Sequence, residues 1–147
     1  MAKSKQLKSE GRLIALDVGI KRTGLAVTDS MQMIASPITG CLTKDLFQQL
    51  DQLIGEEPCA GLVIGDPVQM DGQASESATF IHGLVDKLKK KYPDTNIYRE
   101  DERFSSRLAS KSLVAAGLPK MKRQDKLRVD STSAAIILQS FLQRNKK

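Results

Sequence analysis

Asp17 is the residue of this chain whose type and position most clearly indicate a candidate functional site. It follows an apolar run at residues 13–16 and precedes a glycine-containing turn that carries two cations, Lys21 and Arg22. A carboxylate among apolar residues is costly unless a positive group meets it, and that group can be a basic side chain or a metal ion. Two roles therefore stand open for Asp17: a structural ion pair with Lys21 or Arg22, or a cation-binding site.

A second carboxylate, Asp130, stands at the start of an apolar helix face. With Ala134, Ile137 and Phe141 it follows the spacing i, i+4, i+7, i+11, which places the four side chains on one side of a helix. Because the other three are apolar, this face is expected to pack on a sheet. The alternative role for Asp130 is to cap the helix or to pair with the dipole at its N-terminal end.

The charge of the chain favours a polyanionic partner. The net charge is +6, and basic residues gather immediately before Asp130 and at both ends of the chain, which suits binding to phosphates. At the two ends, solvation of the tails explains the charge equally well. There is no Trp and only 4% of the residues are aromatic, so a base-stacking platform for single strands is not expected.

The composition also limits where in the cell the protein is expected and which roles its cysteines can have. No run approaches the ~20 apolar residues of a membrane span, and no apolar signal core follows the basic start, so we expect a cytoplasmic protein that makes no contact with a membrane. Cys41 and Cys59 lack metal-ligand spacing and a disulfide framework, and we expect ordinary thiols. The single histidine, His82, is expected to pack partly buried on a helix.

The apolar patterning predicts the elements that must position the two acids. Pro37 indicates that the third strand lies at an edge of the sheet or that Pro37 lies at a strand end. The expected strands cover residues 12–18, 22–28, 33–39, 60–64 and 95–98, and the expected helices 44–55, 75–91, 105–117 and 127–143. We expect an α/β fold in which a central mixed five-stranded sheet is flanked by helices, in the element order of a ribonuclease H-like domain. Such a fold can bring distant carboxylates to one end of its sheet.

We expect one such domain at residues 11–143. A flexible basic N-terminus at 1–10 and a basic tail at 144–147 would flank it.

Four segments of the chain carry a family resemblance. They read LDVGIKRTGLAVTD, VIGDPVQMDG, EDERFSS and VDSTSAAIILQSFL, in that order. Together they resemble the YqgF (RuvX) family of Holliday-junction resolvases, also described as pre-16S ribosomal RNA nucleases, over about residues 11–143. The resemblance implies a ribonuclease H-like fold with an acidic, metal-dependent nuclease site. Matching the motifs residue by residue places the site acids at Asp17, Glu102 and Asp130.

Those three acids would support hydrolysis of a phosphodiester bond. The reaction needs an activated water, a stabilised phosphorus and a neutralised leaving oxygen, which two divalent ions about 4 Å apart can supply. Three carboxylates that converge without a cation repel one another and raise at least one pKa. The resemblance therefore predicts bound Mg²⁺ or Mn²⁺, with two ions expected, Asp17 bridging them and Glu102 and Asp130 at the sides.

Basic groups near these acids are expected to hold the nucleic acid. Lys21, Arg22 and Arg103 lie close in sequence to Asp17 and Glu102, and such cations bind phosphates. For Arg103, an internal pair with Asp101 or Glu100 is an equally good role. A basic rim before Asp130 would add contacts that depend on salt and carry no sequence information. Its members are Lys120, Lys122, Arg123, Lys126 and Arg128.

Asp66 departs from the family pattern, which commonly has an apolar residue at this position. It follows a predicted buried strand, so one hypothesis makes it an auxiliary metal ligand. The favoured alternative is an Asp in a turn before Pro67. Asp101, beside Glu102, is expected to orient Glu102 or to pair with Arg103.

Three functions follow from these features. The favoured one is a metal-dependent endonuclease for structured nucleic acid, acting in 5'-end maturation of the 16S ribosomal RNA precursor. The second is a Holliday-junction resolvase acting on branched DNA, which needs a homodimer for paired cuts. The third is a noncatalytic RNA-binding factor, which the presence of all three family acids disfavours. The sequence leaves open whether the protein is a monomer or a homodimer.

Overall fold

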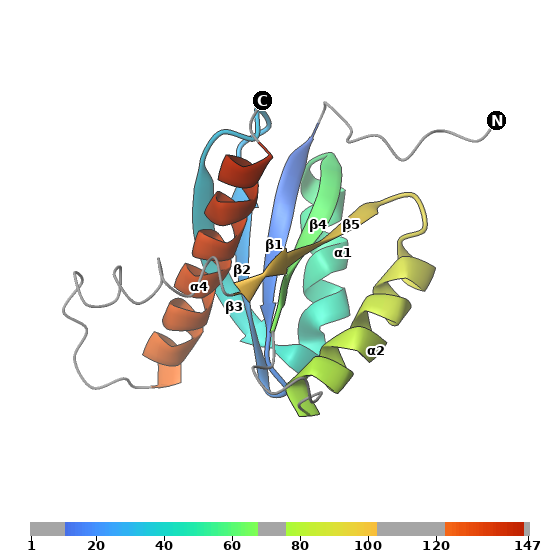
Figure 1. Cartoon of the computed structure of the whole chain (residues 1–147), viewed down its shortest axis with the longest axis vertical. Coiled ribbons are helices and arrows are strands. Elements are labelled where there is room, and N and C mark those ends of the chain that lie inside the picture. Colours follow the sequence, from blue (N-terminus) through green and yellow to red (C-terminus); the bar gives the residue numbers. More distant parts are fainter. Residues whose placement is uncertain (1–10, 68–75, 103–122, 146–147) are drawn as a thin grey trace.

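The computed structural model describes residues 11–67, 76–102 and 123–145, and for residues 123–130 it describes the backbone alone. The described chain forms one sheet with helices on both faces (Figure 1). The expected helix at 105–117, the N-terminal segment 1–10 and the end of the basic tail lie outside the described residues.

The sheet has five strands in the order β3-β2-β1-β4-β5. β1 pairs antiparallel with β2, and β2 antiparallel with β3, whereas β4 runs parallel to β1 and to β5. The mixed five-stranded sheet is therefore confirmed, and Pro37 lies on the edge strand β3, as predicted. The strands are β1 (Arg12–Val18), β2 (Arg22–Thr28), β3 (Ala35–Leu42), β4 (Cys59–Asp66) and β5 (Asn96–Asp101).

The helices cover the two faces of the sheet separately. They are the 3-10 turn η1 (Thr43–Asp45) and the helices α1 (Leu46–Glu56), α2 (Glu76–Lys91) and α4 (Arg123–Arg144). α4 lies on one face, and α1 and α2 lie on the other (Figure 1). Within the part of the chain that the structure describes, no helix is long and apolar enough to cross a membrane.

Alternation along β1 decides which side chains meet which helices. Ile14 and Leu16 pack into the core with α1 and α2, whereas Leu13 and Ala15 pack against α4. Successive side chains of a strand point to opposite faces, so Asp17 belongs to the α4 face. The predicted apolar stripe of the last helix is confirmed on this face for its described side chains, because Ala134, Ile137 and Phe141 are all buried there.

Several element boundaries differ from those expected. β5 continues through Asp101, where the pattern predicted an end at residue 98, because Glu100 and Asp101 still pair with β4. β3 is shifted towards the C-terminus, and α4 begins four residues earlier than expected. The partly buried role expected for His82 is wrong: Leu84 joins the packed face of α2, and His82 lies exposed.

Candidate active site

The site lies where the parallel strands β1, β4 and β5 all end. Asp17 is the second-last residue of β1, pairs in register with Gly24 of β2, and is half-buried. Carboxyl ends of parallel strands meet at one edge of a sheet, which is where open α/β folds bind ligands. Asp17 therefore faces α4 from the sheet edge at which such folds bind their ligands.

Glu102 meets Asp17 at this edge. It directly follows β5, shares the α4 face with Glu100, and its carboxyl group is hydrogen-bonded to that of Asp17. Burial raises the pKa of Glu102, the charges of Asp66 and Asp101 raise it further, and the hydrogen bond with Asp17 opposes them. Two carboxyl groups can share a hydrogen bond only when one holds a proton. With both ionised, the pair needs a cation.

Gly65, which the sequence reasoning missed, makes the space for this pair. It is the second-last residue of β4, between the ends of β1 and β5. A Cβ atom on residue 65 would lie 2.9 Å from Glu102 Oε1 and 2.8 Å from Ile137 Cδ1. The Glu102 carboxylate can lie over the sheet because residue 65 has no side chain. A glycine near the end of a buried strand was the available signal, since such glycines often mark close approach.

The backbone of Asp130 lies near the same edge. Its neighbour Ser131 is buried, and the Ser131 hydroxyl accepts a hydrogen bond of 3.4 Å from the backbone N–H of Leu25. Leu25 follows Gly24, the register partner of Asp17. The turn of α4 that carries Asp130 therefore passes beside the strand next to Asp17. The Asp130 side chain itself is outside what the structure describes.

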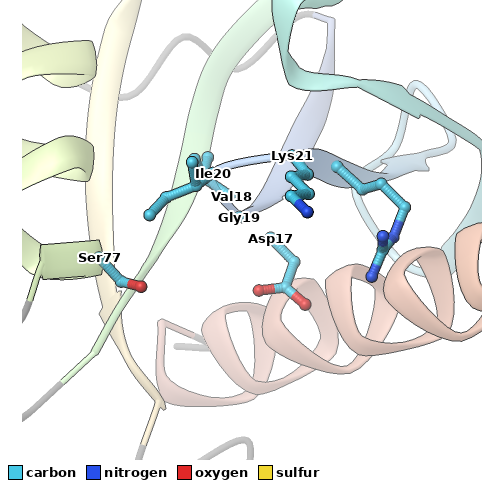
Figure 2. Close-up of a pocket in the computed structure, with 7 residues that line it drawn as sticks. Asp17, Val18, Gly19, Ile20, Lys21 and Ser77 are labelled. Atoms are coloured by element: carbon cyan, nitrogen blue, oxygen red, sulfur yellow. The ribbon is translucent and has the colours of Figure 1, made fainter.

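A pocket of about 440 Å³ opens next to Asp17 (Figure 2). The turn between β1 and β2 forms most of its wall, and Ser77, in the first turn of α2, faces the turn from the other side. Figure 2 shows the Lys21 amine and the Asp17 carboxylate in the same part of the pocket. Its lining residues are Asp17, Val18, Gly19, Ile20, Lys21, Arg22 and Ser77. Ser77 gave no signal in the sequence beyond its position at a helix start.

Of the predicted phosphate-binding residues, the structure describes two side chains. Lys21 is exposed and Arg22 is half-buried, and both line the pocket that contains Asp17. A point charge and a planar guanidinium beside a carboxylate suit a phosphate that approaches the acid. Arg103, Lys120 and Lys122 lie outside the described residues, as do the side chains of Arg123, Lys126 and Arg128.

Asp66 has a basic partner of its own. Its carboxylate lies 2.7 Å from the guanidinium of Arg99 on β5. Alternation also puts Asp66 on the face of Leu62 and Ile64, which pack with α1 and α2, whereas Asp17 faces α4. The turn position expected for Asp66 is wrong, because Asp66 is the last residue of β4 and pairs in register with Asp101 of β5; its described role is the ion pair with Arg99. Metal ligation by Asp66 stays a prediction.

The described donors fit a hard divalent cation. Asp17 and Glu102 offer carboxylate oxygens side by side, and a Mg²⁺ ion that keeps several waters needs only one or two carboxylates. Burial first, and then the negative charges of Asp66 and Asp101, raise the pKa of Glu102, and a bound cation would offset both effects. Among the described side chains there is no cluster of three or more Asp, Glu, His or Cys that could hold a metal ion, so a third acid would have to come from Asp130 or another residue outside them.

Solved structures define the class of the fold. The chain matches RuvC of Thermus thermophilus in complex with a Holliday junction substrate with a TM-score of 0.58 and 11% identity, over 92% of this chain and 97% of that one. A second RuvC structure from Thermus thermophilus matches with a TM-score of 0.52 and 10% identity, over 90% and 96%. The fold is therefore ribonuclease H-like, as the element order predicted.

Sequence comparison then gives the family. The sequence model of the RuvX family, described as Holliday junction resolvase, matches residues 11–144. A protein of Flavobacterium johnsoniae is 44% identical over 131 residues, covering 89% of this chain and 95% of its own. One of Porphyromonas gingivalis is 45% identical over 132 residues, covering 90% and 96%. Both are named as candidate pre-16S rRNA nucleases. This chain belongs to the RuvX family, and the resemblance drawn from its motifs is confirmed.

Proposed function

We propose that this protein is a metal-dependent endonuclease that hydrolyses phosphodiester bonds in structured nucleic acid. One observation carries the proposal: Asp17 and Glu102, 85 positions apart in the chain, share a hydrogen bond at the sheet edge that also holds Lys21 and Arg22. Two carboxylates held together beside two cations can bind both a divalent ion and a phosphate.

Each group has a separate part in this reaction. Asp17 and Glu102 would hold the metal ions, with Asp130 of α4 as the third acid and Mg²⁺ or Mn²⁺ as the metal. Such ions would supply activation of the attacking water and neutralisation of the leaving oxygen. Lys21 and Arg22 bind the phosphates next to the cleaved bond and hold the backbone of the substrate beside Asp17. Because they read phosphates and not bases, cleavage position depends on the shape of the substrate.

The substrate that we propose is the precursor of 16S ribosomal RNA, cut during maturation of its 5' end. Two relatives at 44% and 45% identity carry this activity in their names, and the excess positive charge of +6 suits a large RNA. This substrate places the protein in the cytoplasm. Residues 11–143 would form the catalytic domain, with the basic segments 1–10 and 144–147 adding phosphate contacts.

Resolution of Holliday junctions is the second candidate. The description of the RuvX family supports it, and so does the fold shared with a RuvC bound to a Holliday junction. Paired cuts across a two-fold junction require a homodimer, whereas cleavage of a ribosomal RNA precursor can be done by a monomer. A noncatalytic RNA-binding role leaves the close pairing of Asp17 and Glu102 without a purpose.

One assay separates these functions. The purified protein is incubated with a 16S rRNA precursor fragment and with a four-way DNA junction, each with Mg²⁺, Mn²⁺ or EDTA. We expect metal-dependent cleavage of the RNA and a loss of about 100-fold or more in Asp17→Asn and in Glu102→Gln. Asp86→Asn, which changes an exposed acid in the middle of α2, serves as the control and should cleave normally.

The other outcomes are equally informative. Cleavage that persists in EDTA or in Asp17→Asn would overturn the metal-dependent mechanism. Paired, symmetric cuts in the junction without cleavage of the RNA would favour the resolvase. Binding of RNA without cleavage under any metal would favour the noncatalytic role.

A further inference from the structure

The turn that presents Lys21 and Arg22 is too tight to accept a side chain at its first position. It joins β1, which ends at Val18, to β2, which begins at Arg22. The Gly19 N–H donates to the Arg22 carbonyl at 2.8 Å, and a Cβ atom on Gly19 would lie 2.7 Å from that same oxygen. This contact closes the turn but leaves its outer carbonyl groups, those of Gly19 and Lys21, to be satisfied by something else.

Thr43 satisfies both carbonyls from another part of the chain. It is the first residue of η1, directly after the edge strand β3. Its backbone N–H donates to the Lys21 carbonyl at 2.9 Å, and its hydroxyl donates to the Gly19 carbonyl at 2.6 Å. One residue therefore binds the turn at two points, one on each side of Ile20.

A second hydroxyl fixes the first. Thr23 is the second residue of β2 and pairs in register with Val18 of β1, next to the turn. Its Oγ1 atom lies 2.9 Å from Thr43 Oγ1. A hydroxyl has one proton, and that of Thr43 is given to Gly19, so Thr23 is the donor in this pair. Thr23 is 0% exposed and Thr43 is 8% exposed. Water has little access to replace these bonds, and losing one leaves a buried polar group without its partner.

We propose that Thr43 is a positioning residue for substrate binding, because its hydroxyl holds the Gly19–Lys21 backbone in the shape that directs Lys21 and Arg22 towards the phosphates beside Asp17. This rests on the proposed nuclease function. We call the hydrogen-bonded set of Gly19, Lys21, Thr23 and Thr43 the turn clamp. It contains no group that reacts with the substrate.

The structure separates what the turn clamp controls from what it does not. Asp17 lies within β1, which is paired with β2 on one side and β4 on the other, and its partner Glu102 follows β5. Neither acid depends on Thr43 for its position. Loosening the turn should therefore weaken phosphate binding, because a loop that is ordered before binding lowers the entropic cost of binding. The two acids should stay in place.

The test compares matched threonine variants. Thr43→Val keeps the shape of the side chain and removes the hydroxyl, and Thr43→Ser keeps the hydroxyl. Thr28→Val is the control, because Thr28 is also a buried threonine (3% exposed) with two hydrogen bonds, to the Leu13 N–H and the Asp29 carbonyl, at the far end of β2. Steady-state cleavage is measured at several salt concentrations, and hydrogen exchange of the Gly19 amide is followed in the free protein.

We expect Thr43→Val to raise KM about five- to tenfold, the scale of one buried hydrogen bond, with kcat within about twofold of the parent. The difference from the parent should shrink as salt rises, because the weakened contacts are to phosphates. The Gly19 amide should exchange faster in Thr43→Val than in Thr28→Val. Thr43→Ser should restore the parent KM. If Thr43→Val does not fold, Thr23→Val tests the same clamp from the other hydroxyl and should also raise KM.

Two results would overturn the proposal while leaving the nuclease function standing. One is a KM in Thr43→Val equal to that in Thr28→Val, and the other is a fall in kcat at unchanged KM. A parent protein that neither cleaves nor binds nucleic acid would overturn the nuclease function itself, and with it the role of the clamp in binding. Faster exchange at Gly19 in that case would show only that Thr43 orders the turn.

Discussion

The packing around Gly65 is tight, and the absence of one carbon atom there decides where a carboxylate lies. Glu102 Oε1 and Ile137 Cδ1 would be 2.9 Å and 2.8 Å from a Cβ at this position. Both are ends of flexible side chains, and both contacts are too short to keep, so the sheet can accept an alanine only by moving the two side chains. Displacing Glu102 would break its contact with Asp17.

We therefore predict that Gly65→Ala damages activity more than stability. Cleavage should fall by about tenfold or more, since catalytic groups tolerate displacements of less than ~1 Å. The free energy of unfolding should fall by about 1–3 kcal/mol, the range for an added carbon in a packed region. Cleavage kinetics and urea unfolding measure the two effects. Gly55→Ala is the control, because a Cβ on Gly55 of α1 meets nothing within 4 Å. Full activity in Gly65→Ala would show that Glu102 does not need this space.

Cys41 gives a residue-scale test of the packing near the turn clamp. Burial, aided by the charge of Asp45, raises the pKa of its thiol from 9.0 to about 11. At pH 8 only about one thiol in a thousand is then ionised, and the thiolate is the reactive form. In a Cys59→Ser background, we predict very slow labelling by a disulfide reagent at pH 8 that speeds up in urea. Because the folded pKa is the higher one, stability should decline as pH rises from about 9 towards 11. Rapid labelling of the folded protein at pH 8 would contradict this.

At the scale of elements, a buried carboxylate joins β5 to α4. Glu100 is 2% exposed, accepts a hydrogen bond of 2.7 Å from the Ser140 hydroxyl, and lies 3.2 Å from the Arg144 guanidinium. Glu100 lies in β5, which Glu102 directly follows. Ser140 lies in α4, which also contains Asp130. This contact thus connects β5, at whose end Glu102 lies, with the helix that carries the predicted third acid, Asp130.

Breaking this contact should cost about 2–4 kcal/mol of unfolding free energy in Glu100→Ala, because Ser140 and Arg144 lose a charged, buried partner. Ser140→Ala removes one neutral donor and should cost about 1–3 kcal/mol. The double variant should cost less than the sum, because the two residues act on each other. Denaturant unfolding of the four proteins measures this cycle. Strict additivity would show that the contact contributes no coupling.

The same carboxylate explains where the sequence was a poor guide to the elements. A run of charged residues from Arg99 to Glu102 is typical of a surface turn, and the pattern ended the strand there. β5 continues because Glu100 finds its partners on α4, 40 or more positions later in the chain. The apolar runs of β1, β2 and β4 were predicted well, since their periodicity is a local property.

At the scale of the whole molecule, the site depends on contacts that no local pattern contains. Asp17 stood out because it is a lone acid on an apolar strand, and Glu102 and Asp130 were predicted by resemblance to the family. The sequence did not predict Gly65 or Thr43. Gly65 acts through empty space and Thr43 through hydrogen bonds to a turn more than 20 positions earlier, so their roles become visible only when the sheet is assembled.

The apposition of Asp17 and Glu102 also links metal binding to the stability of the whole fold. Without a cation, burial and the charges of Asp66 and Asp101 make ionisation of Glu102 costly. Two ionised carboxylates side by side also repel each other, so replacing Asp17 by a neutral amide should stabilise the fold, as active-site substitutions often do. We predict that Asp17→Asn unfolds at a higher temperature than the parent in EDTA.

A ligand that binds only the folded state stabilises it by RT ln(1 + [L]/Kd), about 2.7 kcal/mol at a concentration of 100 Kd. Adding Mn²⁺ or Mg²⁺ should therefore raise the unfolding temperature of the parent and leave that of Asp17→Asn nearly unchanged. Asp86→Asn, with its exposed acid on α2, should respond to metal as the parent does. An equal metal response in the parent and in Asp17→Asn would place the ion elsewhere, whatever the cleavage assay gives.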